Sequence, residues 1–171
     1  MNLFRRLAPP LTLSLAVAGL LAGCAGVPRP ADLATPKLRP GQDEAAAVAE
    51  LGPLTNRYTL PQGGTRLEFA KGPLGHQTWM VDLDGAGRIS AVEQVLNPRR
   101  FAEVRNGMTA QELTLLLGRP GKMQREYQDR QTWYWRFPTY ECLIFAVTLS
   151  PLGRVIQGGA ELPDPACDVS Q

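Results

Sequence analysis

The chain has 171 residues, of which 44% are hydrophobic and 20% are charged. Its 18 Lys and Arg side chains outnumber its 16 Asp and Glu side chains, and Arg5 and Arg6 near the N-terminus account for the whole excess. Binding to nucleic acid depends on neutralising phosphates with basic side chains. The balanced charge of the rest of the chain therefore argues against nucleic acid as a partner.

The first 23 residues have the order of a cleavable signal peptide. Arg5 and Arg6 precede an apolar run over residues 11–21, which has the length of a signal h-region. This run is too short to span a membrane as a helix. We therefore expect residues 1–23 to direct export and to be removed. An ordinary secretory signal that happens to contain a cysteine is the alternative to a lipoprotein signal.

The apolar run ends in Leu21-Ala22-Gly23-Cys24, which resembles the bacterial lipobox. The resemblance implies that Cys24 carries lipid chains such as palmitate and becomes the mature N-terminus. Each buried CH₂ group contributes about 0.8 kcal/mol, so several chains would anchor the protein without spanning the bilayer. In proteins with this motif, an Asp after the cysteine marks retention in the inner membrane. Ala25 stands there, which implies the periplasmic face of the outer membrane.

Residues 24–40 have the composition of a tether. Four prolines and scattered small residues occur in this stretch without apolar periodicity. Such a composition is typical of an extended linker. We expect it to space a folded domain from the membrane.

After the tether, the sequence repeats itself without gaps at a shift of 66 residues. The repeat divides the chain into a first unit, residues 41–97, and a second unit, residues 98–168. We interpret it as a tandem duplication. Matching pairs include Leu51-Gly52 with Leu117-Gly118, Val81 with Val147, Leu83 with Leu149, and Gly87-Arg88 with Gly153-Arg154.

The second unit is predicted to start with two short helices. Asn97 and Pro98 are an N-cap and a first helical residue, and the segment from Thr109 to Glu112 has the pattern of a capping box. Gly118 is expected to end the second helix. In the first unit, Asp43 occupies the equivalent cap. The apolar stripe of the second helix is Leu113, Leu116 and Leu117.

Alternating apolar and polar side chains then predict strands in both units. Turns that contain glycine lead into one further strand in each unit. Each unit is thus predicted to be α+β, with short helices packed on one face of a small antiparallel β-sheet. The strand positions are around 67–69, 79–83 and 88–95 in the first unit, and 133–137, 143–149 and 154–158 in the second.

The segment from Phe101 to Pro120, FAEVRNGMTAQELTLLLGRP, resembles the SmpA/OmlA, or BamE, family of small outer-membrane lipoproteins. In that family a Gly-Met-Thr cap, a short helix and a Leu-Gly-x-Pro stop precede a Trp-Tyr strand and a β-meander. Trp133-Tyr134 and the hairpin over residues 149–155 extend the match over most of the second unit. The first unit matches in Leu51-Gly52-Pro53 and in its strand pattern.

The resemblance implies a non-catalytic protein-binding scaffold in outer-membrane protein assembly or envelope integrity. Members of the family are accessory subunits of the machine that inserts β-barrel proteins into the outer membrane. The doubled unit departs from the single-domain members. Duplicated versions of a similar unit occur in β-lactamase inhibitory proteins, whose concave sheet grips another protein. The alternative is therefore a periplasmic inhibitor-like module that binds an enzyme through its sheet face.

The cysteine count fits an exported protein. With Cys24 assigned to lipid, Cys142 and Cys167 remain, and we predict a disulfide between them. A bridge across about 25 residues would contribute roughly 3 kcal/mol in the chain-entropy model. Two free thiols, or a nucleophilic cysteine, are the alternatives.

The sequence offers little for catalysis or metal binding. His76 lies in a loop rich in Gly and Pro, with no Ser or Cys nucleophile at a readable spacing. Asp82-Leu-Asp84-Gly85 begins like a calcium loop, but it lacks the later acidic ligands and coincides with a hairpin turn. We therefore expect no catalytic residues, no metal ligands and no cofactor.

Aromatic residues in the strand near residue 135 suggest either core packing or a binding site. Trp133 and Trp135 align with Leu67 and Phe69 in the first unit and share a face with apolar side chains of the next strand. We therefore expect both tryptophans to belong to the core.

The opposite sides of the strands differ between the two units. In the first unit this side carries Glu68, Thr78, Met80 and Asp82, whereas in the second it is unusually apolar for a solvated surface. We expect the second side to bind a partner protein, and the sequence leaves packing against the other repeat open. The predicted partner-binding residues are Tyr134, Arg136, Ile144 and Ala146.

Overall fold

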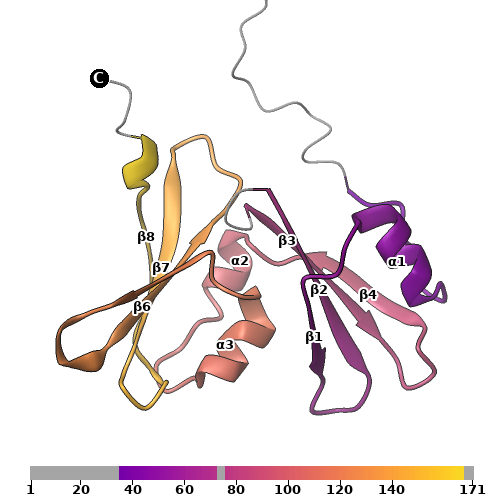
Figure 1. Cartoon of the computed structure of the whole chain (residues 1–171), viewed down its shortest axis with the longest axis horizontal. Helices are drawn as coiled ribbons and strands as arrows, with labels where there is room; N and C mark the ends of the chain where they lie inside the picture. Colours follow the sequence, from indigo (N-terminus) through magenta and orange to yellow (C-terminus); the bar gives the residue numbers. More distant parts are fainter. Residues whose placement is uncertain (1–34, 73–75, 168–171) are drawn as a thin grey trace, which may run out of the picture. The chain divides into compact units, whose positions relative to one another are not determined.

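The computed structural model describes residues 35–72 and 76–167 (Figure 1). The expected signal peptide, Cys24 and most of the expected tether lie outside the described residues. Within the described residues, every helix is too short or too polar to cross a membrane.

The first helix, α1 (Glu44–Leu51), begins at the cap that its sequence predicts and ends at a glycine. The carboxylate of Asp43 accepts a hydrogen bond from the backbone N–H of Ala46, at 3.1 Å. Gly52 ends the helix with φ of 81°, a conformation that glycine adopts without steric cost. Ala47 and Leu51 are buried and pack against the first sheet.

The first sheet has four antiparallel strands in sequential order. Its core consists of apolar side chains on the α1 side of the sheet, among them Leu67, Phe69, Trp79 and Val81. In the two strands that carry these four residues, the alternation of apolar and polar side chains is the pattern that predicted the strands. The strands are β1 (Asn56–Thr59), β2 (Thr65–Lys71), β3 (Gln77–Leu83) and β4 (Ile89–Gln94).

Two short helices connect the sheets. In α2 (Pro98–Phe101), Asn97 is the N-cap. In α3 (Ala110–Leu117), Thr109 and Glu112 form the predicted capping box, because each side chain bonds the other's backbone N–H. Gly118 ends α3 with φ of 80°.

The second sheet also has four antiparallel strands in sequential order. Its core side faces α2 and α3, and the stacked rings of Phe101 and Phe145 lie 4.0 Å apart between centroids. The strands are β5 (Lys122–Arg125), β6 (Gln131–Arg136), β7 (Leu143–Leu149) and β8 (Val155–Pro163), with 3₁₀ helices η3 (Tyr127–Asp129) and η4 (Pro165–Cys167).

The elements recur at the shift of 66 residues that the sequence shows. Helices α1 and α3, strands β1 and β5, and strands β3 and β7 match in both bounds. An isolated bridge joins Asp43 to Arg88 in the first half, and its equivalent joins Thr109 to Arg154 in the second. The α+β class with two antiparallel sheets is confirmed.

The structure adds two strands that the sequence patterns did not predict. Strands β1 and β5 have four residues each, with the sequences NRYT and KMQR. All four residues of β5 are exposed, so no apolar alternation marks it. Both are edge strands, where polar side chains are common.

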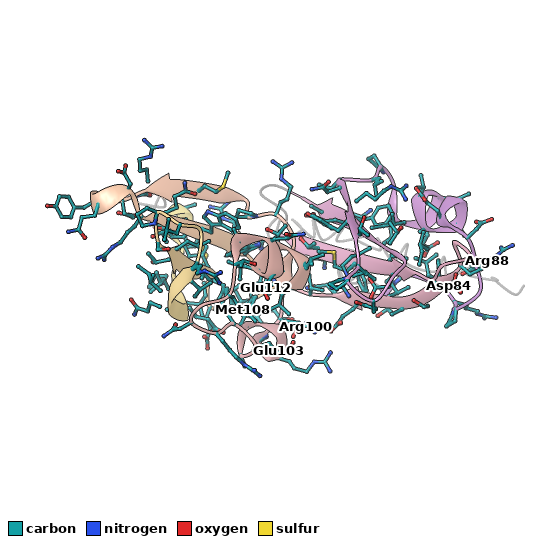
Figure 2. The ribbon with its side chains drawn as sticks, turned by 90° about the horizontal axis from the view of Figure 1, so that it is seen from below. Asp84, Arg88, Arg100, Glu103, Met108 and Glu112 are labelled. Carbon is teal, nitrogen blue, oxygen red and sulfur yellow. A yellow bond between two sulfur atoms is a disulfide. The ribbon has the colours of Figure 1, made fainter. Side chains whose placement is uncertain are left out.

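The β3–β4 turn explains the segment that resembles the start of a calcium loop. Figure 2 shows Asp84 and Arg88 close together in this turn. The carboxylate of Asp84 accepts hydrogen bonds from the backbone N–H groups of Ala86 and Arg88, both at 2.9 Å. Asp82 instead pairs with Arg66 on the neighbouring strand. These two acids therefore have structural roles in the hairpin.

Candidate protein-binding face

Strand register determines which side chains share a face, because residues opposite each other in an antiparallel pair project to the same side. On one side of the second sheet, Tyr134 is opposite Lys122 and Ala146, and Ile144 is opposite Arg136 and Leu162. We call this side the distal face of the second sheet, and it is defined by these six residues.

The distal face lies away from the helices of the second half. Trp135, Phe145 and Val147 project from the other side of the same strands and pack with α2 and α3. Among the described residues, no α-helix packs on the distal face. It is therefore the side of the second sheet that can meet another molecule.

The apolar surface of the distal face comes mainly from two side chains. Leu162 is 41% exposed and Tyr134 is half-buried, whereas Ile144 and Ala146 are 8% and 7% exposed. Their larger cross-strand neighbours, Arg136 and Tyr134, account for this low exposure. Ile144 and Ala146 thus form the floor of the face rather than its accessible rim.

Charged side chains border the apolar residues. The ammonium of Lys122 lies 5.6 Å from the centre of the Tyr134 ring, within the range of a cation–π contact. The guanidinium of Arg136 donates two hydrogen bonds to the carboxylate of Asp164, one of them at 3.1 Å. The hydrogen bond from Arg136 holds the pKa of Asp164 below its usual range, against the effect of burial.

A C-terminal segment fixes one edge of the distal face. Cys142, before β7, and Cys167, at the end of η4, lie at disulfide-bonding distance, with their Cα atoms 6.4 Å apart. The backbone N–H of Asp164 donates to the carbonyl of Cys142 at 2.8 Å. These contacts hold Asp164 where it can pair with Arg136.

A cavity of about 380 Å³ opens on the distal face beside this segment. Its walls include Lys122, Tyr134, Arg136 and Ile144 from the sheet and Pro165 after β8. The volume is in the range of sites that accept a few side chains or a small ligand. The face therefore combines an apolar floor, an aromatic ring and a cation around a hollow.

The equivalent side of the first sheet is buried within the chain. We call it the inner face of the first sheet, defined by Tyr58, Arg66, Glu68, Thr78 and Met80. Glu68 is 0% exposed, and Thr78 and Met80 are almost as deeply buried. Tyr58 and Met80 pack against the cluster that contains Leu113 and Leu117 of α3.

Hydrogen bonds bind the inner face to the end of α3. The guanidinium of Arg66 donates to the carbonyl of Leu115 at 2.6 Å, and the carboxylate of Glu68 accepts from the backbone N–H of Arg119 at 3.0 Å. The hydroxyl of Tyr58 donates to Glu68. Burial, and then the hydrogen bond to Glu68, raise the pKa of Tyr58 far above its usual value.

The repeat relates these two faces residue by residue. Glu68 aligns with Tyr134, Thr78 with Ile144, and Met80 with Ala146. In the first half these positions meet the C-terminal end of α3 and the residues that follow it. In the second half the described chain supplies no further α-helix to contact them, and only the 3₁₀ helix η4 lies at the edge of the face. The sequence left open whether the distal face packs against the other repeat. In the structure, the hydrogen bonds between the two halves are made by the inner face of the first sheet.

The predicted site residues lie as follows. The four predicted partner-binding residues, Tyr134, Arg136, Ile144 and Ala146, share the distal face. Trp135 is buried and donates from its indole N–H to the carbonyl of Gly118 at 3.1 Å, and Trp133 packs against the same core. His76 is exposed.

Sequence patterns missed three residues of the distal face and its edge. Lys122 lies on an edge strand without alternation, and Leu162 lies beyond the predicted end of the last strand. Asp164 is 28 residues from its partner Arg136. One sequence signal could have extended the predicted face. Ala160 and Leu162 are two residues apart, so they continue the alternation of the last strand beyond its predicted end.

Within the described residues, no group of three or more His, Cys, Asp or Glu side chains is placed to hold a metal ion. Comparison with protein-family models, with curated proteins and with solved structures found no match to this chain.

Proposed function

We propose that this chain is a non-catalytic lipoprotein of the bacterial outer membrane that binds another envelope protein through the distal face of its second sheet. The observation that carries the proposal is the contrast between the two halves. The end of α3 packs against the inner face of the first sheet, and no α-helix of the described chain packs on the matching distal face. Apolar surface of this kind favours protein association.

Membrane attachment through Cys24 completes the proposal. The lipobox-like Leu21-Ala22-Gly23-Cys24 and the proline-containing tether support an anchored module that extends into the periplasm. The BamE-like segment over residues 101–120 supports a scaffold role in outer-membrane protein assembly or envelope integrity. Packing of the BamE type in each unit is part of this proposal.

Crosslinking in intact cells followed by mass spectrometry tests the proposal. The variant should alter the accessible part of the face, so we choose Tyr134→Asp with Leu162→Asp and leave the buried Ile144 unchanged. We expect the wild-type chain to capture a defined envelope protein and the double variant to lose it. Tyr127→Asp is the matched control, because Tyr127 is 85% exposed on η3, outside the distal face.

The captured protein decides between the scaffold role and the inhibitor-like alternative. Subunits of the barrel-assembly machine would support the assembly role, and one soluble periplasmic enzyme would support the inhibitor-like alternative. Capture that is unchanged in the Tyr134→Asp, Leu162→Asp variant would contradict binding through the distal face.

A further inference from the structure

The hollow on the distal face is lined by basic side chains whose hydrogen-bond donors are not all in use. The guanidinium of Arg136 donates to Asp164 from Nε and Nη2, and its Nη1 has no hydrogen-bond partner among the described residues. The ammonium of Lys122 is exposed and forms no ion pair within the described part of the chain. Both groups carry more N–H donors than these contacts use, so they can still bind a ligand.

The acceptors at the hollow are already occupied. Among the described residues that line it, Asp164 carries the one carboxylate, and both of its oxygens accept from Arg136. One of these oxygens also accepts from the backbone N–H of Ala166, at 3.0 Å. Two cations, Lys122 and Arg136, stand against this one carboxylate and leave the lining with one positive charge in excess. The hollow therefore favours a ligand that brings negative charge and acceptor oxygens.

The strand register brings the two cations to the same part of the face. Lys122 is opposite Tyr134, and Arg136 follows Tyr134 by two residues on the same strand. Diagonal neighbours of this kind in an antiparallel sheet are about 7–8 Å apart, a span that two long side chains can close on one group. Tyr134 and Ile144 supply apolar surface in the same lining.

The matching face of the first sheet has the opposite chemistry. Asn56 and Glu68 hold the positions of Lys122 and Tyr134. There the face itself supplies a carboxylate, since Glu68 accepts from the backbone N–H of Arg119 in the second half. On the distal face an aromatic ring beside a lysine stands in that place. The distal face therefore lacks the acceptor that its counterpart has, and it fits a partner that supplies one.

We propose that the hollow on the distal face binds a carboxylate of the partner protein through the ammonium of Lys122 and the unused N–H groups of Arg136, with the carbon chain of the acid against Tyr134. This inference rests on the proposed function, because it names the chemical group by which an envelope protein is held on that face. The group is the carboxylate of an Asp or Glu side chain or of a chain end. Hydrogen bonds between charged groups are about twice as strong as neutral ones, so this contact would also orient the partner.

A carbodiimide crosslink tests the contact directly. The reagent joins a lysine amine to a carboxylate that touches it, forming an amide with loss of water. The lysines of the chain are Lys37, Lys71 and Lys122, so each adduct can be assigned by peptide mass spectrometry. With the full-length protein in isolated envelopes, we expect an adduct between Lys122 and an envelope protein. The mapped peptide shows whether the carboxylate belongs to an acidic side chain or to a chain end.

Charge variants measure the contribution of the contact. Partner capture is followed with the photoreactive residue benzoylphenylalanine at position 160, because Ala160 is exposed, lies opposite Ala146 on the same face and is outside the lining of the hollow. Lys122→Met should lower capture about tenfold, the factor that corresponds to about 1.4 kcal/mol in binding. Lys122→Arg should retain capture and give no carbodiimide adduct at position 122.

Arg125→Met is the matched control. It removes the same charge from the same exposed strand, at a position opposite Gln131 and outside the lining of the hollow. We expect this variant to capture the partner as the wild-type chain does. Equal losses in Lys122→Met and Arg125→Met would show an effect of overall charge and would overturn the carboxylate contact.

The remaining outcomes separate this inference from the proposed function. Capture from position 160 without a carbodiimide adduct at Lys122, or capture that Lys122→Met leaves unchanged, would overturn the carboxylate contact and retain partner binding by the distal face. Adducts of Lys122 only with acids of this same chain, or with a carboxylate that is not part of a protein, would also overturn the inference. The absence of every capture from position 160 of the otherwise wild-type chain would overturn both proposals.

Discussion

Arg66 on the first sheet donates a hydrogen bond to the backbone carbonyl of Leu115 in α3, at 2.6 Å, and so joins the two halves of the chain. The same guanidinium makes two hydrogen bonds to the carboxylate of Asp82, both at 2.6 Å. The carbonyl of Leu115 is one of the last four of the helix, which lack partners within it. Arg66 thus satisfies a helix end and a carboxylate at the interface between the halves.

We predict that Arg66→Met destabilises the chain by roughly 1 to 3 kcal/mol, because it leaves the partly buried Asp82 carboxylate without its cation and the Leu115 carbonyl without its donor. Urea unfolding of the full chain in mild detergent, followed by tryptophan fluorescence, measures the change. Arg57→Met is the matched control, since Arg57 pairs with Glu44 in a more exposed position. We expect that control to cost about 0 to 1 kcal/mol. Equal losses in the two variants would contradict the role of Arg66.

The two helix-ending glycines provide a second test of the interface. Gly52 and Gly118 have φ of 81° and 80°, so an alanine is strained by a similar amount at both. At Gly118 the added Cβ would lie 2.8 Å from Thr78 and 3.0 Å from the Glu68 carboxylate, whereas at Gly52 it would meet only the Lys71 ammonium, at 3.7 Å.

We therefore predict that Gly118→Ala lowers the free energy of unfolding by roughly 1 to 3 kcal/mol more than Gly52→Ala does, the usual cost of overpacking. The same urea titration compares the two variants. If both lose the same stability, backbone strain accounts for the whole effect and α3 does not press closely on the first sheet.

Local sequence signals predicted the parts of the fold that depend on neighbouring residues. The caps at Asp43, Asn97 and Thr109 and the stop at Gly118 all depend on groups within four residues of one another. Their chemistry is complete in the sequence, since a side-chain acceptor meets a free N–H of the same helix. The α+β class followed from these caps and from the strand alternation.

The burial of Glu68 could not be predicted in this way. Its side of β2 is polar in sequence, with Arg66 as the neighbour two residues away, and resembles a solvated face. It is buried because the backbone N–H of Arg119, 51 residues away, and the Tyr58 hydroxyl supply hydrogen bonds to the carboxylate. The Arg136 pair with Asp164 at the candidate site was missed for the same reason, because only tertiary structure brings the two together.

The proposed lipid attachment at Cys24 predicts where the protein is located. We expect the wild-type chain to fractionate with the outer membrane and to have an N-terminal peptide that starts at an acylated Cys24. Cys24→Ser should abolish acylation, which intact-mass measurement detects. Ala25→Asp should keep the lipid and move the protein to the inner membrane in a sucrose gradient. An unacylated wild-type chain would contradict the anchor, and an unchanged gradient position of Ala25→Asp would contradict the outer-membrane assignment.

The pairing of Cys142 and Cys167 predicts a measurable contribution to stability. A bridge across a sequence separation of 25 residues is expected to contribute about 3 kcal/mol through the entropy of the unfolded chain. The Cys142→Ser, Cys167→Ser variant should show that loss in urea unfolding. Reduction should add the mass of two protons to the wild-type chain, and the absence of that change would rule out the bridge.

The Arg136 contact with Asp164 predicts a pH dependence. Since the hydrogen bond from Arg136 holds the pKa of Asp164 below its usual value of about 3.9, the unfolded chain takes up a proton at this carboxylate before the folded chain does. The stabilisation is therefore fully present above pH of about 4 and is lost as the pH falls through the lower, folded-state pKa.

Asp164→Asn should remove this stabilisation at every pH above about 4. Urea titrations measure the free energy of unfolding of both chains at each pH. We expect the wild-type chain to be more stable than the variant at about pH 6, and the difference to shrink below a pH of about 4. Asp129→Asn controls for the change in net charge, because Asp129 has no ion-pair partner among the described residues. A stability difference that stays constant from pH 6 down to acid unfolding would show that the packing of the C-terminal segment, and not the charge of Asp164, holds the edge of the distal face.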